Sequence, residues 1–417
     1  MMINIGIIGA GIHGWDHCLG FDRLTESQII AVADPNEIQL KMSQSTIQKS
    51  KPVFFKDYKE LLRMPEVQAV VIATPTNLHA QITIDALKAN KDIFLEKPIA
   101  PTIEATDNII KEYAKTDRII QIGLEYRYSN LFRSVAHLIE KKRFGNVMMV
   151  YCKEYYENFP SPWFFDEKKS GGALLDKNCH HFDLFNWIIQ SPPKRVFAMG
   201  GQHVVKSGHG IQCSYSRYPG LPLKNPTILD HANVLIEYEN EAKANLGLCM
   251  YETQPIEGLE IGIIGDNGIW ALAKNDSKLI ISENNKIEEL DVDYYSDNEG
   301  LVHIGVQAER REFLNCITMR KQPYANLSIG REASVLAFAA EKSIKENRIV
   351  NISEFSNPEI DVIFKELGYD KKQENPPVFS LPESELKAKM KKRLRSRERD
   401  LKRELKRIQK KIRELSG

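Results

Sequence analysis

Apolar residues in the first 124 positions come in short runs that alternate with stretches of helical spacing. Short apolar runs separated by amphipathic stretches are typical of βαβ units, whose parallel strands are buried on both faces. The pattern predicts strands at Ile3–Ile8, Gln28–Ala33, Ala69–Ala73, Asp92–Leu95 and Arg118–Gly123, and crossover helices at Leu78–Ala89 and Thr102–Thr116.

After Arg127 the pattern changes to strand-like segments with turns between them, which predicts a second domain with a large, mostly antiparallel sheet. The segment 208–225 is rich in Gly, Pro and Tyr and is expected to be a long loop beside a substrate pocket. The predicted strands are Val147–Tyr156, Arg195–Val205, Asn233–Tyr238, Ala242–Tyr251 and Leu259–Ile264, and the predicted helices are Gly171–Gln190 and Arg331–Glu346.

The C-terminal residues 386–417 are dominated by Lys, Arg and Glu, with a heptad-like series of Leu and Ile that predicts an amphipathic, coiled-coil-like helix. From Leu381 onward, 15 Lys and Arg stand against 6 Asp and Glu, a net charge of +9 that leaves −8 on the rest. Self-association is the leading interpretation. Binding to the acidic body or to a membrane surface are alternatives. Nucleic acid is disfavoured because no aromatic residues are interleaved with the basic ones.

Composition narrows the class of protein. A length of 417 residues suggests two or three domains, and a formal net charge of +1 gives the whole chain no general attraction to nucleic acid or membranes. The six cysteines lie far apart without a CxxC pair, which favours reduced thiols and a cytoplasmic location. The apolar start lacks a basic leader and is expected to be a strand, and no run is long enough to span a bilayer.

The most informative motif is the glycine-rich turn Gly9-Ala10-Gly11-Ile12-His13-Gly14, which follows the first predicted strand and precedes a helix. Gly9 allows the tight turn, Gly11 lets the backbone approach phosphates, and Gly14 lets the helix pack closely on the strand. The N–H groups at the helix start then face the anion. The spacing predicts a dinucleotide site with the pyrophosphate at this turn.

Asp34 ends the second predicted strand, twenty residues beyond Gly14, where a carboxylate accepts hydrogen bonds from an adenosine ribose. A carboxylate there repels a ribose phosphate, and Asp34-Pro35-Asn36 contains no Arg or Lys to neutralise one. We therefore expect NAD rather than NADP.

Two further segments contain candidate catalytic residues. Lys97, in Leu95-Glu96-Lys97-Pro98, follows a predicted parallel strand and is placed to point into the nucleotide cleft, although a solvated lysine is an equal alternative. Pro98 also allows a cis peptide before it. On a helix, Asp176, His180 and Asp183 share one face, an arrangement that suits a proton-transferring imidazole held by carboxylates.

Alternatives to this second site remain open. A helix N-terminus with a capping Asp and a core histidine gives the same pattern. A zinc site built from Cys179, His180, His181 and Asp183 is disfavoured, because adjacent helical residues diverge and no distant pair has ligand spacing. A Cys179 nucleophile is also disfavoured.

Together these motifs resemble the glucose-fructose oxidoreductase/inositol dehydrogenase (Gfo/Idh/MocA) family over residues 1–350. The resemblance rests on the glycine turn with Asp34, Ala73-Thr74-Pro75 followed by His79, the run Glu96-Lys97-Pro98, and the segment 176–183. It implies a Rossmann doubly wound parallel sheet followed by an α+β domain whose open sheet is used in oligomers. It also implies NAD(P)-dependent oxidation or reduction of a sugar or cyclitol.

The resemblance assigns roles to matching positions. Lys97 is expected to hold the reacting oxygen, His180 to be the general acid/base, and Asp176 to orient it. The expected cofactor contacts are Gly9, Gly11, Ile12, His13, Gly14, Asp34, Thr74, Pro75, His79, Glu96, Lys97 and Arg127, and the expected substrate contacts are Lys97, Arg127, Trp163, Lys177, His180 and Asp183; no metal is expected.

Several positions depart from the family pattern or stay ambiguous. Lys177-Asn178-Cys179 stands where many members have small residues, and Lys177 is a candidate contact for an anionic substrate. Trp163 and Phe164, with Tyr155 and Tyr156, are candidates either for stacking on a sugar or for the core. Asp230-His231 is more typical of a turn or cap than of the pocket.

We expect four regions: a cofactor domain (1–124), a substrate and oligomerisation domain (125–350), a linker (351–385) and the basic helix (386–417). The leading hypothesis is an NAD-dependent sugar or cyclitol dehydrogenase that forms a homodimer or homotetramer. The alternative is a catalytically silent NAD sensor or scaffold acting through the basic helix. A tightly held cofactor used in a closed redox cycle is a variant of the enzyme hypothesis.

Overall fold

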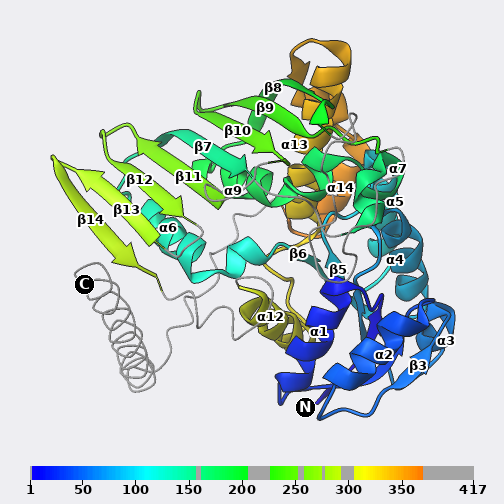
Figure 1. Cartoon of the computed structure of the whole chain (residues 1–417). Coiled ribbons are helices and arrows are strands. Elements are labelled where there is room, and N and C mark those ends of the chain that lie inside the picture. Colours follow the sequence, from blue (N-terminus) through cyan, green and yellow to red (C-terminus); the bar gives the residue numbers. More distant parts are fainter. Residues whose placement is uncertain are drawn as a thin grey trace, which may run out of the picture. The chain divides into compact units, whose positions relative to one another are not determined.

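The computed structural model describes residues 2–155, 161–204, 226–251, 258–274, 278–292 and 305–369 (Figure 1). All of the described residues belong to one compact unit. The predicted loop 208–225, Tyr156, residues 370–385 and the basic helix 386–417 lie outside the described residues. Within the described ranges, no helix combines the length and apolar character needed to cross a membrane.

The first sheet confirms the predicted parallel architecture. Its six strands lie in the order β3-β2-β1-β4-β5-β6, the order of a dinucleotide-binding sheet, and all neighbours pair in parallel. The central strands are apolar throughout because helices cover both faces. The strands are β1 Ile3–Ile8, β2 Ser27–Ala33, β3 Val53–Phe55, β4 Ala69–Ile72, β5 Asp92–Glu96 and β6 Ile120–Gly123.

The predicted crossover helices α4 (His79–Lys88) and α5 (Ile103–Tyr113) are confirmed, and Thr102 caps α5 by accepting a hydrogen bond from the Ala105 N–H. Three other elements near the second strand were not predicted: β3, α2 and α3. They are short or half-exposed, so they show little apolar periodicity. The helices here are α1 Ile12–Arg23, α2 Glu37–Thr46 and α3 Tyr58–Leu62.

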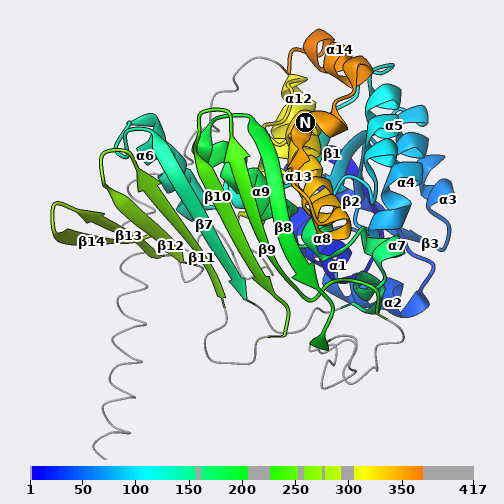
Figure 2. The same ribbon diagram turned by 90° about the horizontal axis from the view of Figure 1, so that it is seen from above.

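The second sheet has nine strands, in the order β14-β13-β12-β11-β7-β10-β9-β8-β15. It is antiparallel except for the parallel pair β10–β7, which confirms the predicted sheet type. Helices α9 and α13 pack on one face of this sheet (Figure 2). The strands are β7 Val147–Tyr155, β8 Pro193–Gly201, β9 His231–Tyr238, β10 Lys243–Cys249, β11 Gly258–Gly265, β12 Trp270–Lys274, β13 Lys278–Glu283, β14 Lys286–Asp291 and β15 Val350–Asn351.

The helices of this domain differ in detail from the prediction. The expected helix 171–190 is divided at Lys177-Asn178 into α8 (Ala173–Asp176) and α9 (Cys179–Ile189). Strands β12–β14 were not predicted: β12 and β13 are short apolar runs without strict alternation, and charged residues interrupt β14. The remaining elements are η1 Thr76–Leu78, η2 Glu125–Tyr128, α6 Asn130–Glu140, η3 Pro162–Phe165, α7 Glu167–Ser170, α12 Val306–Met319 and α13 Leu327–Glu346.

The predicted linker is wrong over residues 351–369. These residues form η4 (Ile352–Phe355) and α14 (Pro358–Glu366), and Ile360 is fully buried in the core of the first sheet. Phe313 and Leu314 of α12 enter the core on the other face of that sheet. Packing around the cofactor domain therefore includes segments that follow the second sheet in sequence.

Candidate active site

A cleft of about 580 Å³ lies at the carboxyl ends of the parallel strands. This is the edge at which ligands bind in open α/β sheets. The cleft brings together most of the predicted cofactor residues with two residues of the second domain's site. Among the residues that line it are Gly9, Gly11, Ile12, His13, Asp34, Thr74, Pro75, Glu96, Lys97, Trp163 and Asp176.

The glycine turn has the geometry that a pyrophosphate site needs. Gly9 has φ of +91°, and a Cβ on Gly14 would lie 1.8 Å from the Gly9 carbonyl oxygen, so neither position tolerates a side chain. A Cβ on Gly11 would meet nothing within 4 Å. Gly11 also caps α1 without a side-chain hydrogen bond, so the first N–H groups of the helix remain available to an anion. The residues therefore fit a dinucleotide.

Asp34 is held in place by the backbone around it. Its Oδ2 accepts a hydrogen bond from the Ala10 N–H (2.7 Å) and its Oδ1 accepts one from the Asn36 N–H (2.8 Å). Lys56 also lines the cleft but is ion-paired with Glu37. Local sequence around Asp34 does not reveal this lysine, because it comes from the segment that joins β3 to α3.

Lys97 lies where β5 ends, and the peptide bond between Lys97 and Pro98 is cis. Its Nζ donates a hydrogen bond to the Asp176 carbonyl (3.0 Å) and lies 3.6 Å from Asp176 Oδ1. Burial opposes the positive charge, but Asp176 above all holds the pKa of Lys97 above its ordinary value. Asp176 Oδ2 also accepts a hydrogen bond from the Thr76 hydroxyl (2.8 Å). The resulting site presents a fixed ammonium group to the cleft.

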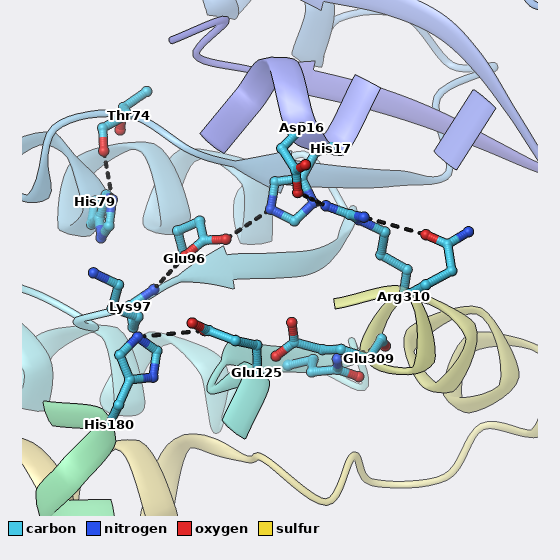
Figure 3. A network of polar contacts seen from close by, with 12 residues as sticks. Asp16, His17, Thr74, His79, Glu96, Lys97, Glu125, His180, Glu309 and Arg310 are labelled. Atoms are coloured by element: carbon cyan, nitrogen blue, oxygen red, sulfur yellow. Dashed lines mark hydrogen bonds and ion pairs between the residues drawn. The ribbon is translucent and has the colours of Figure 1, made fainter. Parts of the chain in front are cut away.

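A chain of buried polar contacts fixes the neighbouring Glu96 (Figure 3). Arg310 of α12 binds Asp16 (2.6 Å) and donates from Nε to His17 Nδ1 (3.2 Å), which leaves His17 Nε2 to donate to Glu96 Oε1 (2.8 Å). Although burial favours the neutral acid, the His17 hydrogen bond and nearby positive charges hold the Glu96 pKa well below its ordinary value. Glu96 is therefore a carboxylate.

A carboxyl group that the sequence analysis did not name, that of Glu125, lies next to His180. Glu125 Oε2 lies 3.4 Å from His180 Nε2, and both side chains are buried (Figure 3). The Tyr126 ring centroid lies 4.9 Å from that of His180. The sequence analysis missed Glu125. The available signal was an acid two residues after the end of β6, at the same sheet edge as Lys97.

Arg127 and Asp183 form a buried ion pair with each other, and their expected contacts with the cofactor and substrate stay predictions. The guanidinium donates two hydrogen bonds of 2.6 Å to the carboxylate and lies over the rings of Trp187 and Tyr324. Burial opposes this charge, but Asp183 outweighs it and raises the pKa of Arg127. The pair joins η2 to α9 and does not line the described cleft.

Lys177 is likewise occupied within the protein. Its Nζ lies 2.7 Å from Glu154 Oε1, and His181 Nε2 lies 3.3 Å from Glu154 Oε2. Only 7% of the Lys177 side chain is exposed, and its expected contact with an anionic substrate stays a prediction. Glu154, His181 and Cys152 could together offer metal ligands. The group that places a positive charge beside the Glu154 carboxylate is the Lys177 ammonium.

The remaining candidate residues differ in whether they line the cleft. His79 bridges the carbonyl oxygens of Thr74 and Pro98 (2.9 and 2.8 Å) and is buried behind the cleft lining, which corrects its assignment as a cofactor contact. Trp163 lines the cleft and also packs on the core of the second domain. Tyr155 lies on the face of β7 opposite Glu154, and Asp230 binds the His203 N–H and the His231 ring, as a cap does.

A dinucleotide cleft that has a glycine turn at one end and Lys97 with Asp176 at the other is typical of a nucleotide-dependent oxidoreductase. Residues 3–124 match the model of an oxidoreductase family with an NAD-binding Rossmann fold, and residues 132–271 match the GFO/IDH/MocA C-terminal domain. The chain belongs to the GFO/IDH/MocA family.

Relatives extend over most of the chain. A myo-inositol 2-dehydrogenase of Thermotoga maritima is 24% identical over 367 residues, which cover 84% of this chain and 99% of the relative. The scyllo-inositol dehydrogenase of Lactobacillus casei, solved with NAD(H) and scyllo-inositol, has a TM-score of 0.67 at 20% identity and covers 85% of this chain and all of that one. A levoglucosan dehydrogenase solved with NADH has a TM-score of 0.71 at 18% identity, over 84% and 99% of the two chains. These likenesses show the fold.

Proposed function

We propose that this protein is an NAD-dependent dehydrogenase that acts on a secondary hydroxyl, or in reverse on a ketone, of a sugar or cyclitol. The proposal rests on a single cleft that has a cofactor-binding turn at one end and candidate catalytic residues at the other. A bare glycine turn lies at one end, and Lys97 with Asp176 lies at the other; His180, the candidate acid/base, contacts Glu125 (Figure 3). The names of the relatives supply the substrate class.

Nicotinamide, when bound, supplies or accepts the hydride. The chain's own residues account for binding and for the proton. Backbone N–H groups at the start of α1 hold the pyrophosphate, and Asp34 holds the adenosine ribose. The Lys97 ammonium holds the reacting oxygen and stabilises negative charge on it. His180 exchanges the hydroxyl proton, and Asp176 together with Thr76 positions Lys97.

NAD is preferred over NADP because the Asp34 carboxylate faces the ribose and Lys56 is already paired with Glu37. Residues 1–124 act as the cofactor domain and 125–350 as the substrate domain, with added packing from α12 and α14. The second sheet assembles copies into a dimer or tetramer in the cytoplasm. Exposed Met149, Met199 and Leu235 on this sheet support that assembly.

The test is a substrate screen with purified protein, in which reduction of NAD and of NADP is followed against inositols, hexoses, sugar acids, sugar phosphates and nucleotide sugars. We expect turnover with one compound group, faster with NAD, that is lost in Lys97→Ala and His180→Ala. Binding of NADH without turnover anywhere in the panel would favour the sensor hypothesis. Failure to bind either nucleotide would reject the whole proposal.

A further inference from the structure

Glu125, which is buried, and Glu96, whose side chain is 13% exposed, are two carboxyl groups near Lys97 that lie in opposite electrostatic environments (Figure 3). Glu96 accepts a hydrogen bond from His17 and is held as a carboxylate. Glu125 forms its ion-pair contact with the His180 ring (3.4 Å), which is charged only when protonated. Two carboxyls whose surroundings separate their proton affinities commonly divide the acid and base roles of a site.

The groups around Glu125 make its ionisation costly. Burial raises its pKa first, repulsion from Glu96 adds to this, and Lys97 opposes both, so the pKa rises to about 8. Glu309 of α12 is also near, with 2% of its surface exposed and an Oε1 that lacks a hydrogen-bond partner among the described residues. The charged or titratable groups that face Glu125 are Glu96 and Lys97 from the end of β5, Cys179 and His180 from α9, Glu309 from α12 and Asp16 from α1.

We propose that Glu125 is the proton reservoir of His180, with its Oε2 exchanging a proton with His180 Nε2. This inference rests on the proposed dehydrogenase function. Glu125 acts through His180 and is a positioning and proton-storing residue, not a catalytic one. Its 3.4 Å separation from the ring is longer than an optimal hydrogen bond, but such contacts commonly tighten when a substrate binds.

The proton balance follows directly. In carbonyl reduction the carbon gains the hydride of the reduced nicotinamide, and the oxygen gains a proton from the His180 imidazolium, which is left as a neutral imidazole. Glu125 then gives its proton to His180 and becomes a carboxylate, which recovers a proton from solvent after the product leaves. In alcohol oxidation each transfer is reversed. Protonated Glu125 therefore supports reduction, and ionised Glu125 supports oxidation.

The first experiment compares pH profiles of kcat for the wild type, Glu125→Gln, Glu125→Asp and Glu341→Gln. Glu341 is the matched control, because burial likewise raises its pKa to about 8 but its charged neighbours are Lys345 and Glu167. We expect wild-type reduction to slow above about pH 8 and oxidation to quicken there. Glu125→Gln should lower kcat about tenfold and lose this dependence, and Glu125→Asp should restore part of it. Glu341→Gln should keep the wild-type profile.

A second experiment needs no turnover. An infrared titration of the cofactor-free protein should show a protonated carboxyl signal that ionises near pH 8, is missing in Glu125→Gln, and shifts in His180→Gln. The shift would demonstrate that the two groups share their protons even if no sugar in the panel is a substrate.

Two results would overturn the inference. One is a Glu125→Gln enzyme whose pH profile matches the wild type, whatever its overall rate, because a merely structural role changes the rate alone. The other is a Glu125 infrared signal that titrates identically with and without the His180 ring. If the wild type turns over no compound in the panel but His180→Gln still shifts the infrared signal, the result would count against the proposed substrate class and not against the proton exchange.

Discussion

The two ends of the cleft differ in which part of the chain forms the site: the backbone at the cofactor end and side chains at the catalytic end. At the cofactor end the backbone forms the site, through Gly9, Gly11 and the uncapped start of α1. At the catalytic end the site consists of buried charged side chains that hold one another, with Lys97 against Asp176 and Glu125 against His180. A substitution should therefore act mainly on binding at the first end and on chemistry or stability at the second.

The largest expected effect is at the catalytic end. Lys97→Met keeps the length of the side chain but removes the ammonium that faces Asp176. Because this charge stabilises the reacting oxygen, kcat should fall by about 10²–10⁴. Equilibrium binding of NADH, measured by fluorescence titration, should change less than about threefold. If the affinity for NADH fell by the same factor as kcat, the proposed separation of cofactor binding from chemistry would be wrong.

The next largest effect concerns stability at the same end. Asp183→Asn leaves the Arg127 guanidinium buried without its carboxylate. Breaking a buried ion pair in this way costs about 3–5 kcal/mol of unfolding free energy, which denaturant titration would measure. The double variant Asp183→Asn with Arg127→Met should recover part of the loss. If the single variant were as stable as the wild type, the Arg127–Asp183 ion pair would not be what holds η2 to α9.

At the cofactor end, two neighbouring glycines should behave oppositely. A Gly11→Ala methyl group enters open space, so stability should change by about 1 kcal/mol or less, chiefly through the weaker N-cap, while the Kd for NADH rises about tenfold or more. A Gly14→Ala methyl group lies against the Gly9 carbonyl, so about 1–3 kcal/mol of stability should be lost. Calorimetry of both variants would separate binding from packing. Matching effects on stability would contradict the geometry of the turn.

The smallest effect concerns how stability depends on pH. Folding raises the pKa of Glu125 to about 8. Between the pKa of Glu125 in the unfolded chain and pH 8, this carboxyl is therefore protonated in the folded protein and ionised in the unfolded chain. The stability that protonated Glu125 allows is complete below the unfolded pKa and is lost as pH rises toward 8. Denaturant titration should therefore show that Glu125→Gln becomes more stable relative to wild type as the pH rises from 4 to 8.5. Glu60→Gln at an exposed position of α3 is the control; an equal gain there would point to a general charge effect.

The difference between the two ends also explains what the sequence could predict. Glycine spacing, apolar strands and the acid at Asp34 are local patterns, and the first sheet and its turn follow them. Buried pairs are not local: Arg310 meets Asp16 across 294 positions, and Lys177 meets Glu154. Arg127 and Lys177 were assigned to ligands because a charged side chain in a motif gives no sign of its internal partner. Glu125 was missed for the same reason.

The return of α12 and α14 to the first sheet limits how this protein can be divided. Phe313, Leu314 and Ile360 supply core to the cofactor domain from far beyond residue 124. Arg310 supplies the charge that orders His17 and, through it, Glu96. A fragment ending at residue 124 would expose apolar surface on both faces of its sheet. Chimaeras that exchange cofactor domains between relatives should therefore transfer these late helices together with the N-terminal half.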